Sequence, residues 1–149
     1  MSDVTIAEIA AFATLAVNGA AAAFAGLRWW QVQPSDAIWP LLRAGQAIGG
    51  LQALIAGILF VAGFRPADGL YWLYALLPVA IGVIAEQLRI ASAEQVLENR
   101  DLPDAQAVGA LPESEQRSVV LAVVRREMGV MALAAFVVAV LALRAALIV

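Results

Sequence analysis

Four long apolar stretches determine what this chain can fold into. They occupy approximately residues 4–27, 38–63, 70–90 and 126–148, and a helix needs about 20 apolar residues to cross the hydrocarbon core of a bilayer. Of the 149 residues, 63% are hydrophobic and 14% are charged, and a soluble core cannot absorb that much apolar surface. The sequence therefore predicts an all-α integral membrane protein, with residues 1–149 forming a single four-helix transmembrane domain.

The connections between the stretches predict an antiparallel bundle. Residues 64–69 contain Pro, Asp and Gly and form a short turn, so the second and third helices are expected to be antiparallel neighbours. The longer connection, approximately residues 89–126, is polar, and Pro112 followed by two acids is typical of a helix start. We expect the third and fourth helices to extend into a cytoplasmic hairpin.

The arginines predict an orientation, because positively charged loops stay on the cytoplasmic side. Seven of the nine arginines flank the first and third loops, and only Arg65 and Arg144 lie near the other side of the membrane. Loops one and three are therefore expected in the cytoplasm and both termini outside, in a multi-pass protein of a bacterial inner membrane. The arginines that flank these two loops are Arg28, Arg43, Arg89, Arg100, Arg117, Arg125 and Arg126.

Small residues recur at every fourth position in the first two stretches. Helices in a bilayer associate through close backbone approach, which small residues permit. We expect these ridges to pack the first and second helices together, and a contact between subunits is the alternative. The ridge consists of Ala10, Thr14, Asn18, Ala22 and Gly26 in the first stretch and Gly45, Gly49, Ala53 and Gly57 in the second.

Charged and polar residues gather where three helices reach the cytoplasmic side. A helical rise of about 1.5 Å per residue places Gln46, Glu86 and Glu127 near the inner boundary of the hydrocarbon. Ionic groups at this depth usually pair or reach toward head groups, so both glutamates are expected to stay ionised and paired with arginines, with Arg43, Arg89 and Arg126 as partners. Binding of an anionic lipid or small anion is the alternative. The whole cluster comprises Arg43, Gln46, Glu86, Gln87, Arg89, Arg125, Arg126 and Glu127.

The residue types that are missing restrict the possible chemistry. The chain has no His, Cys or Lys, so the sequence predicts no metal site and no haem, iron–sulfur or Schiff-base cofactor. The net charge of −3 gives no reason to expect a nucleic-acid partner. The deep amides Asn18 and Gln52 are interpreted as interhelical hydrogen-bonding groups. Because no nucleophile–base pair or poised carboxylate pair is visible, we expect no enzymatic activity.

Two functional hypotheses remain. The first is a non-catalytic helix-packing subunit, assembly factor or self-associating scaffold, whose partners are the bilayer and either a second copy or another membrane protein that meets the hairpin. The second is a small-solute, ion or lipid transporter or channel working as a homo-oligomer. The four-span layout and length resemble the small multidrug-resistance transporters, which work as dimers. Their essential glutamate lies in the middle of the first helix, whereas Glu8 lies near the outer end here, which disfavours proton-coupled export.

Overall fold

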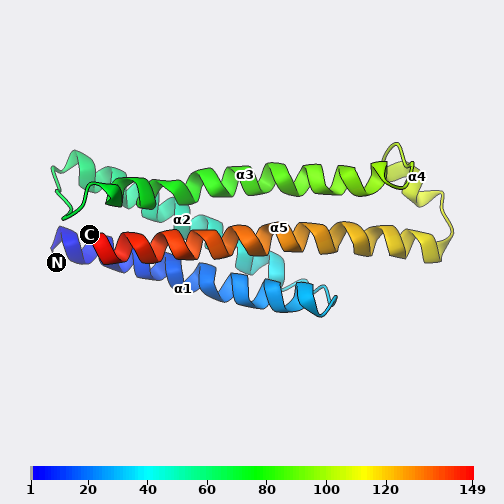
Figure 1. Ribbon diagram of the computed structural model, residues 1–149, viewed down its shortest axis with the longest axis horizontal. Helices are drawn as coiled ribbons and strands as arrows, with labels where there is room; N and C mark the ends of the chain where they lie inside the picture. The colour runs from blue at the N-terminus through cyan, green and yellow to red at the C-terminus, as the bar shows by residue number, and fades with distance from the viewer. Residues whose placement is uncertain (1) are drawn as a thin grey trace.

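The protein is a bundle of helices that run up and down along one long axis (Figure 1). The computed structural model describes residues 2–149. Four helices in this range are long and apolar enough to cross a membrane, and the two ends of the chain lie at the same end of the bundle. The helices are α1 (Asp3–Trp30), α2 (Ile38–Val61), α3 (Leu70–Glu98), the short α4 (Ala105–Gly109) and α5 (Glu113–Ile148).

The helices begin and end at residues with recognisable capping roles. Ser2 caps α1 by accepting a hydrogen bond from the Thr5 amide at 3.2 Å. Gly63 follows the end of α2 with a φ of +86°, the left-handed conformation that terminates many helices and that glycine adopts without strain. As the sequence predicts, α5 begins directly after Pro112, with Glu113 and Glu115 in its first turn.

The helices also differ from the predicted spans in their bounds. α2 ends at Val61, two residues before the predicted end at residue 63, while α1 continues to Trp30. α3 continues to Glu98 and α5 begins 13 residues before residue 126, which confirms the predicted extension of both helices beyond their apolar spans.

α5 is the central helix of the bundle, since it packs against α1 over most of its length and against α3 on another side, while α2 packs on α1 and α3. The packed surfaces are largely alanine, which lets the backbones approach closely. Fully buried alanines include Ala7, Ala11, Ala21, Ala25, Ala56, Ala75, Ala142 and Ala145.

An aromatic cluster closes the end of the bundle that holds both termini. Phe64 and Tyr71 are buried, and their rings meet edge to face with a centroid distance of 6.1 Å. Trp72 lies edge to face against both rings, at 5.1 Å from Tyr71 and 6.0 Å from Phe64. The backbone amide of Asp68 donates to the carbonyl of Ile148 at 3.3 Å, which ties the α2–α3 turn to the end of α5.

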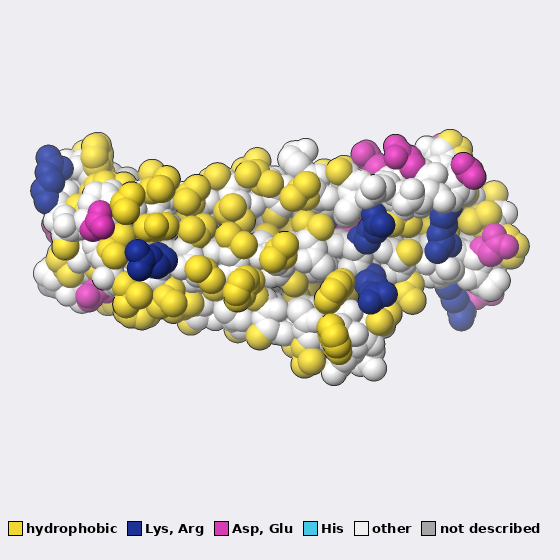
Figure 2. All heavy atoms as spheres, viewed as in Figure 1, with side chains coloured by type: hydrophobic (Ala, Val, Ile, Leu, Met, Phe, Trp, Pro, Cys, Tyr) yellow, Lys and Arg dark blue, Asp and Glu magenta, His cyan; other side chains and the backbone are white. Residues whose placement is uncertain are grey.

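At the other end α3 and α5 continue as a helical hairpin beyond α1 and α2, joined through α4 (Figure 1). With about 1.5 Å of rise per residue, the 36 residues of α5 span roughly 54 Å, against a hydrocarbon core of about 30 Å. Figure 2 shows hydrophobic side chains along the middle of one face, while most charged side chains gather on the hairpin and at the opposite end. The distribution fits a bundle with an apolar band between two polar ends.

Candidate functional site

The candidate site is a network of charged side chains that joins α2, α3 and α5 where the hairpin leaves the bundle. The Glu86 carboxylate on α3 accepts hydrogen bonds from Arg43 at 2.5 Å and Gln46 at 2.9 Å, both on α2. Arg89, one turn further along α3, donates to Glu86 at 3.1 Å and to Glu127 on α5 at 3.0 Å. Three helices are thus connected by one chain of ion pairs.

The helical geometry explains why these groups meet. Arg43 and Gln46 are three residues apart, as are Glu86 and Arg89, so each pair lies on one face of its helix. Arg43 also donates to Gln46 at 2.7 Å, which orients the amide toward Glu86. The Arg43 side chain is 52% exposed, whereas Glu127 is 15% exposed. The network therefore has a solvent-facing edge on α2 and a sheltered edge on α5.

Two cations and two anions make up the network: Arg43 and Arg89 against Glu86 and Glu127. Its formal charge is zero, and each guanidinium already has a carboxylate within hydrogen-bond distance. An added anion would have to compete with these internal partners. The geometry favours a role in connecting the helices over the alternative role in binding an anion.

The other predicted members of the cluster lie outside this network. Gln87 is exposed on α3. Arg126, which the sequence predicts as a partner for a glutamate, instead donates to the Gln95 side chain at 2.5 Å, because it points toward the hairpin part of α3. Arg125 points to the other side of α5 and lies over the ring of Trp29 at 5.8 Å. Successive residues on a helix diverge by about 100°, so Arg125, Arg126 and Glu127 cannot share one face.

A small cavity lies deeper in the bundle, next to the network. It has a volume of about 20 Å³, enough for about one water molecule, and its lining includes Gln46 and Asn18. The Asn18 amide donates to the backbone carbonyls of Thr14 at 3.1 Å and Gly45 at 3.0 Å. A Cβ atom on Gly45 would lie 2.7 Å from Asn18 Oδ1, so a larger residue at position 45 would displace the Asn18 amide from these hydrogen bonds.

The small-residue ridge occupies several faces instead of one. On α2, Gly45 meets α1, but a Cβ on Gly49 would meet Pro78 of α3 at 3.3 Å and Val138 of α5 at 4.0 Å. Ala53 is half-buried and Gly57 is exposed. A step of four residues advances about 400° around a helix, so such a row drifts by about 40° per step. The single packing face expected between α1 and α2 therefore extends over only part of each helix.

The same drift separates the members on α1. Ala10, Thr14 and Asn18 are buried, and the Thr14 hydroxyl donates to the Ile48 carbonyl on α2 at 3.4 Å. Ala22 and Gly26 lie instead along a groove between α1 and α5. Close packing of α1 and α2 through these last two residues is not seen.

Gln52 lies in the middle of α2 with 1% of its surface exposed. Neither its side-chain nitrogen nor its oxygen has a hydrogen-bond partner among residues 2–149, although the sequence predicts an interhelical bond.

Sequence reasoning did not identify the contact between α1 and α5, which builds the groove. Trp29 packs on Gly129, where a Cβ atom would lie 2.9 Å from its indole nitrogen. Arg28, Trp29 and Arg125 line a surface depression at the end of this groove. The alanines at residues 132, 135, 139, 142 and 146 of α5, spaced by three and four, are a signal from which this packing face could have been predicted.

Comparison with known proteins finds no matching family model, no matching curated protein and no matching solved structure. Across residues 2–149, no three His, Cys, Asp or Glu side chains gather in a way that could hold a metal ion. What the arrangement offers chemically is ion pairing between helices, a packed hairpin and apolar grooves.

Proposed function

We propose that this chain is a non-catalytic membrane module that crosses the bilayer four times and presents its α3–α5 hairpin to a protein partner on the cytoplasmic side. The observation that carries the proposal is the hairpin itself. From Glu86 to the end of α3 are 12 residues, and from the start of α5 to Glu127 are 14 residues. These lengths correspond to projections of roughly 18 and 21 Å.

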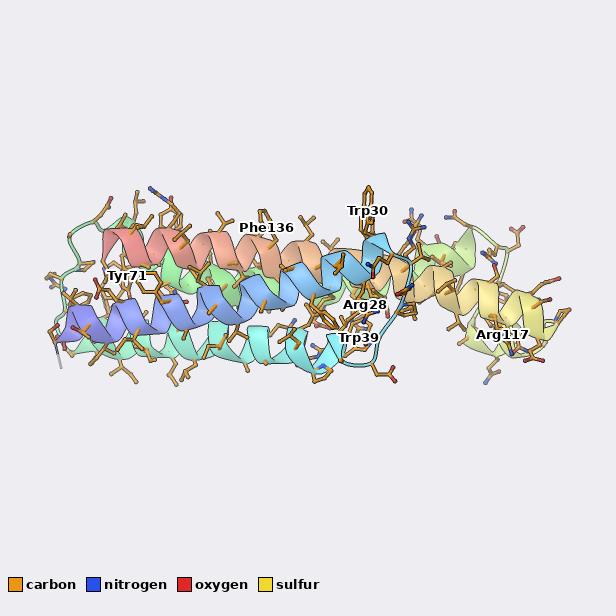
Figure 3. The ribbon with its side chains drawn as sticks, turned by 90° about the horizontal axis from the view of Figure 1, so that it is seen from below. Arg28, Trp30, Trp39, Tyr71, Arg117 and Phe136 are labelled. Atoms are coloured by element: carbon orange, nitrogen blue, oxygen red, sulfur yellow. The ribbon has the colours of Figure 1, made fainter. Side chains whose placement is uncertain are left out.

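Membrane insertion is supported by the exposed side chains of the bundle. Leucine, isoleucine and phenylalanine side chains such as Leu54, Ile58, Phe60 and Leu133 are about 60% exposed, which is unfavourable in water and favourable in lipid. Figure 3 shows Arg28, Trp30 and Trp39 near the connection between α1 and α2, from which the hairpin projects, and Tyr71 near the opposite end of the bundle. Exposed tryptophans such as Trp30, with 78% of its surface exposed, are typical of a membrane interface, and the arginine-rich end is assigned to the cytoplasm.

The hairpin has the properties of a rigid docking element. Val96 of α3 and Val119 of α5 are buried between the two helices, and Arg100 donates to the Ser118 hydroxyl at 3.1 Å. On the outside, Val120 and Leu121 are 54% and 42% exposed. They lie roughly 9–10 Å beyond Glu127 along α5, in the aqueous region, where exposed apolar side chains favour a protein partner.

The alternative function, a transporter or channel, is favoured by Gln52 and the cavity beside Asn18, because both place polarity inside the bundle. The cavity admits about one water molecule, and Gln52 is not among its lining residues. These two features support packing more than conduction. Flux of protons or small cations into proteoliposomes that contain the purified protein would favour the alternative.

Site-specific photocrosslinking in cells tests the hairpin. A photoreactive amino acid at Val120 should give a discrete protein adduct, and the same group at Phe60, an equally exposed apolar position on α2, should give none. Leu121→Glu should abolish the Val120 adduct without changing membrane integration or thermal stability. If Val120 and Phe60 label the same species, or Leu121→Glu leaves the adduct intact, the hairpin is not the docking element.

A further inference from the structure

The groove between α1 and α5 is apolar along its length, and at one end it has two arginines that form no ion pair. Its volume is about 810 Å³, and every residue that lines it is apolar or glycine. On α1 it runs from Leu15 to Trp29 and on α5 from Leu143 to Gly129. Fourteen residues of helix correspond to roughly 21 Å, longer than one leaflet of a hydrocarbon core about 30 Å thick. The groove can therefore accompany an acyl chain through its whole leaflet.

The groove is open because glycines, which have no side chain, line part of it. A Cβ atom on Gly19 or on Gly26 would meet no other atom within 4 Å, so neither glycine is required by packing within the chain. At Gly129, in contrast, a Cβ would collide with Trp29. Trp29 thus closes the basic end of the groove, with 37% of its surface still exposed.

Two arginines stand at this closed end. Arg28 and Arg125 lie beside Trp29 around a surface depression that has no internal volume, and the Arg125 guanidinium lies 5.8 Å from the centre of a Trp29 ring. Arg28 donates to the neutral side chain of Gln33 at 3.2 Å, and its guanidinium lies over the Phe24 ring at 5.4 Å from the centroid. Neither arginine forms an ion pair within residues 2–149, unlike Arg43, Arg89 and Arg117. Their charge is available to an external anion at the depth of the lipid phosphates.

We propose that this groove binds one anionic phospholipid of the cytoplasmic leaflet, with an acyl chain between α1 and α5 and the phosphate at Arg28 and Arg125. The inference rests on the proposed membrane insertion and orientation. Guanidinium groups bind phosphate by charge-assisted hydrogen bonds, and basic pockets between helices on the cytoplasmic side recognise anionic head groups.

A second copy of the chain fits the groove less well. Two copies inserted in the same direction and related by a two-fold axis meet through the same surface at the same depth. Arg28 and Arg125 of both copies would then face each other, and four like charges would have no acid among the groove residues to neutralise them.

The test begins with membrane integration. Alkaline carbonate extraction should leave the protein in the membrane pellet. If carbonate releases it, the proposed membrane module fails, and the lipid site fails with it. If the protein stays in the membrane, the lipid site is tested separately by native mass spectrometry with added palmitoyl-oleoyl phosphatidylglycerol or phosphatidylcholine.

We expect one phosphatidylglycerol molecule to remain bound under conditions that remove phosphatidylcholine. Arg28→Gln and Arg125→Gln should each weaken retention about fivefold. The control Arg65→Gln/Arg144→Gln changes the net charge by the same amount as Arg28→Gln/Arg125→Gln, but at the opposite end of the bundle, and should have no effect. Gly19→Phe should fill the groove and displace the lipid, whereas Gly57→Phe, also open at its Cβ position, should not.

Two results would overturn the lipid site. Equal retention of both phospholipids, unchanged by the arginine substitutions, would mean ordinary lipid contact only. A lipid-independent dimer mass that Gly19→Phe converts to the monomer mass would mean that a second copy occupies the groove. Thermal unfolding of each variant in detergent checks that the fold is intact.

Discussion

The guanidinium of Arg89 on α3 donates a 3.0 Å hydrogen bond to the carboxylate of Glu127 on α5. This is the one ion pair that Glu127 forms within residues 2–149, whereas Glu86 has Arg43 as well as Arg89. The Arg89–Glu127 pair is also the more sheltered connection, with side chains 26% and 15% exposed. Glu127 therefore depends on Arg89 alone for its ion pair, whereas Glu86 does not depend on one arginine.

Removing Arg89 should therefore destabilise the bundle more than removing Arg43. Arg89→Met leaves the sheltered Glu127 carboxylate without a partner, and we expect a loss of roughly 1–3 kcal/mol, less than for a fully buried pair. Arg43→Met should cost about 1 kcal/mol or less, because Arg43 is half exposed. Thermal or denaturant unfolding in detergent measures both.

A double-mutant cycle separates this pairing from the loss of the arginine side chain itself. Arg89→Met/Glu127→Gln should recover part of the stability lost in Arg89→Met, because no uncompensated carboxylate remains. Strictly additive effects of the two substitutions would show that the pair contributes nothing to stability.

Gly49→Leu should disrupt the bundle, while Gly57→Leu on the same helix should not. A Cβ at Gly49 would already lie 3.3 Å from Pro78, whereas one at Gly57 meets nothing within 4 Å. We expect a loss of about 1–3 kcal/mol for Gly49→Leu, as for other overpacked positions. Unfolding in detergent measures the stability and light scattering the mass. A lower mass with unchanged stability for Gly57→Leu would assign this end of the ridge to an interface between subunits.

The proposed orientation predicts which loops an impermeant thiol reagent can reach in intact cells. Ala67 in the α2–α3 turn and Ala110 between α4 and α5 are both exposed, and the chain has no cysteine of its own to compete. Ala67→Cys should react in intact cells, whereas Ala110→Cys should react only after the cells are opened. The opposite pattern would place the arginine-rich hairpin outside and contradict the assignment of the groove to the cytoplasmic leaflet.

Hydropathy and breakers were sufficient to predict four long helices and the start of α5, because helix length and capping are local properties. The choice of which helix faces pack together, in contrast, depends on residues that are far apart in the sequence. The buried face of α1 follows an alternating spacing of four and three residues: Ala7, Ala11, Thr14, Asn18, Ala21 and Ala25. The predicted ridge has a constant spacing of four residues, so its later members, Ala22 and Gly26, lie off this buried face. The ion pairs around Glu86 were predictable from depth. The 100° step of a helix already separates Arg125 from Arg126, but which of them faces α3 and which faces α1 depends on how α5 is rotated.

Gln52→Leu should stabilise the protein. The Gln52 side chain is 1% exposed and both of its polar atoms lack partners within residues 2–149, and a buried amide without hydrogen bonds costs about 1–3 kcal/mol. Leucine has a similar volume and no polar atom, so the expected gain is about 1 kcal/mol or more. Asn18→Leu is the matched control, since Asn18 donates to two carbonyls, and it should destabilise. If Gln52→Leu also lowers the unfolding temperature in detergent, Gln52 has a partner in the native membrane state, such as an internal water or a second subunit. Proteoliposome flux that the same substitution abolishes would then favour the transporter.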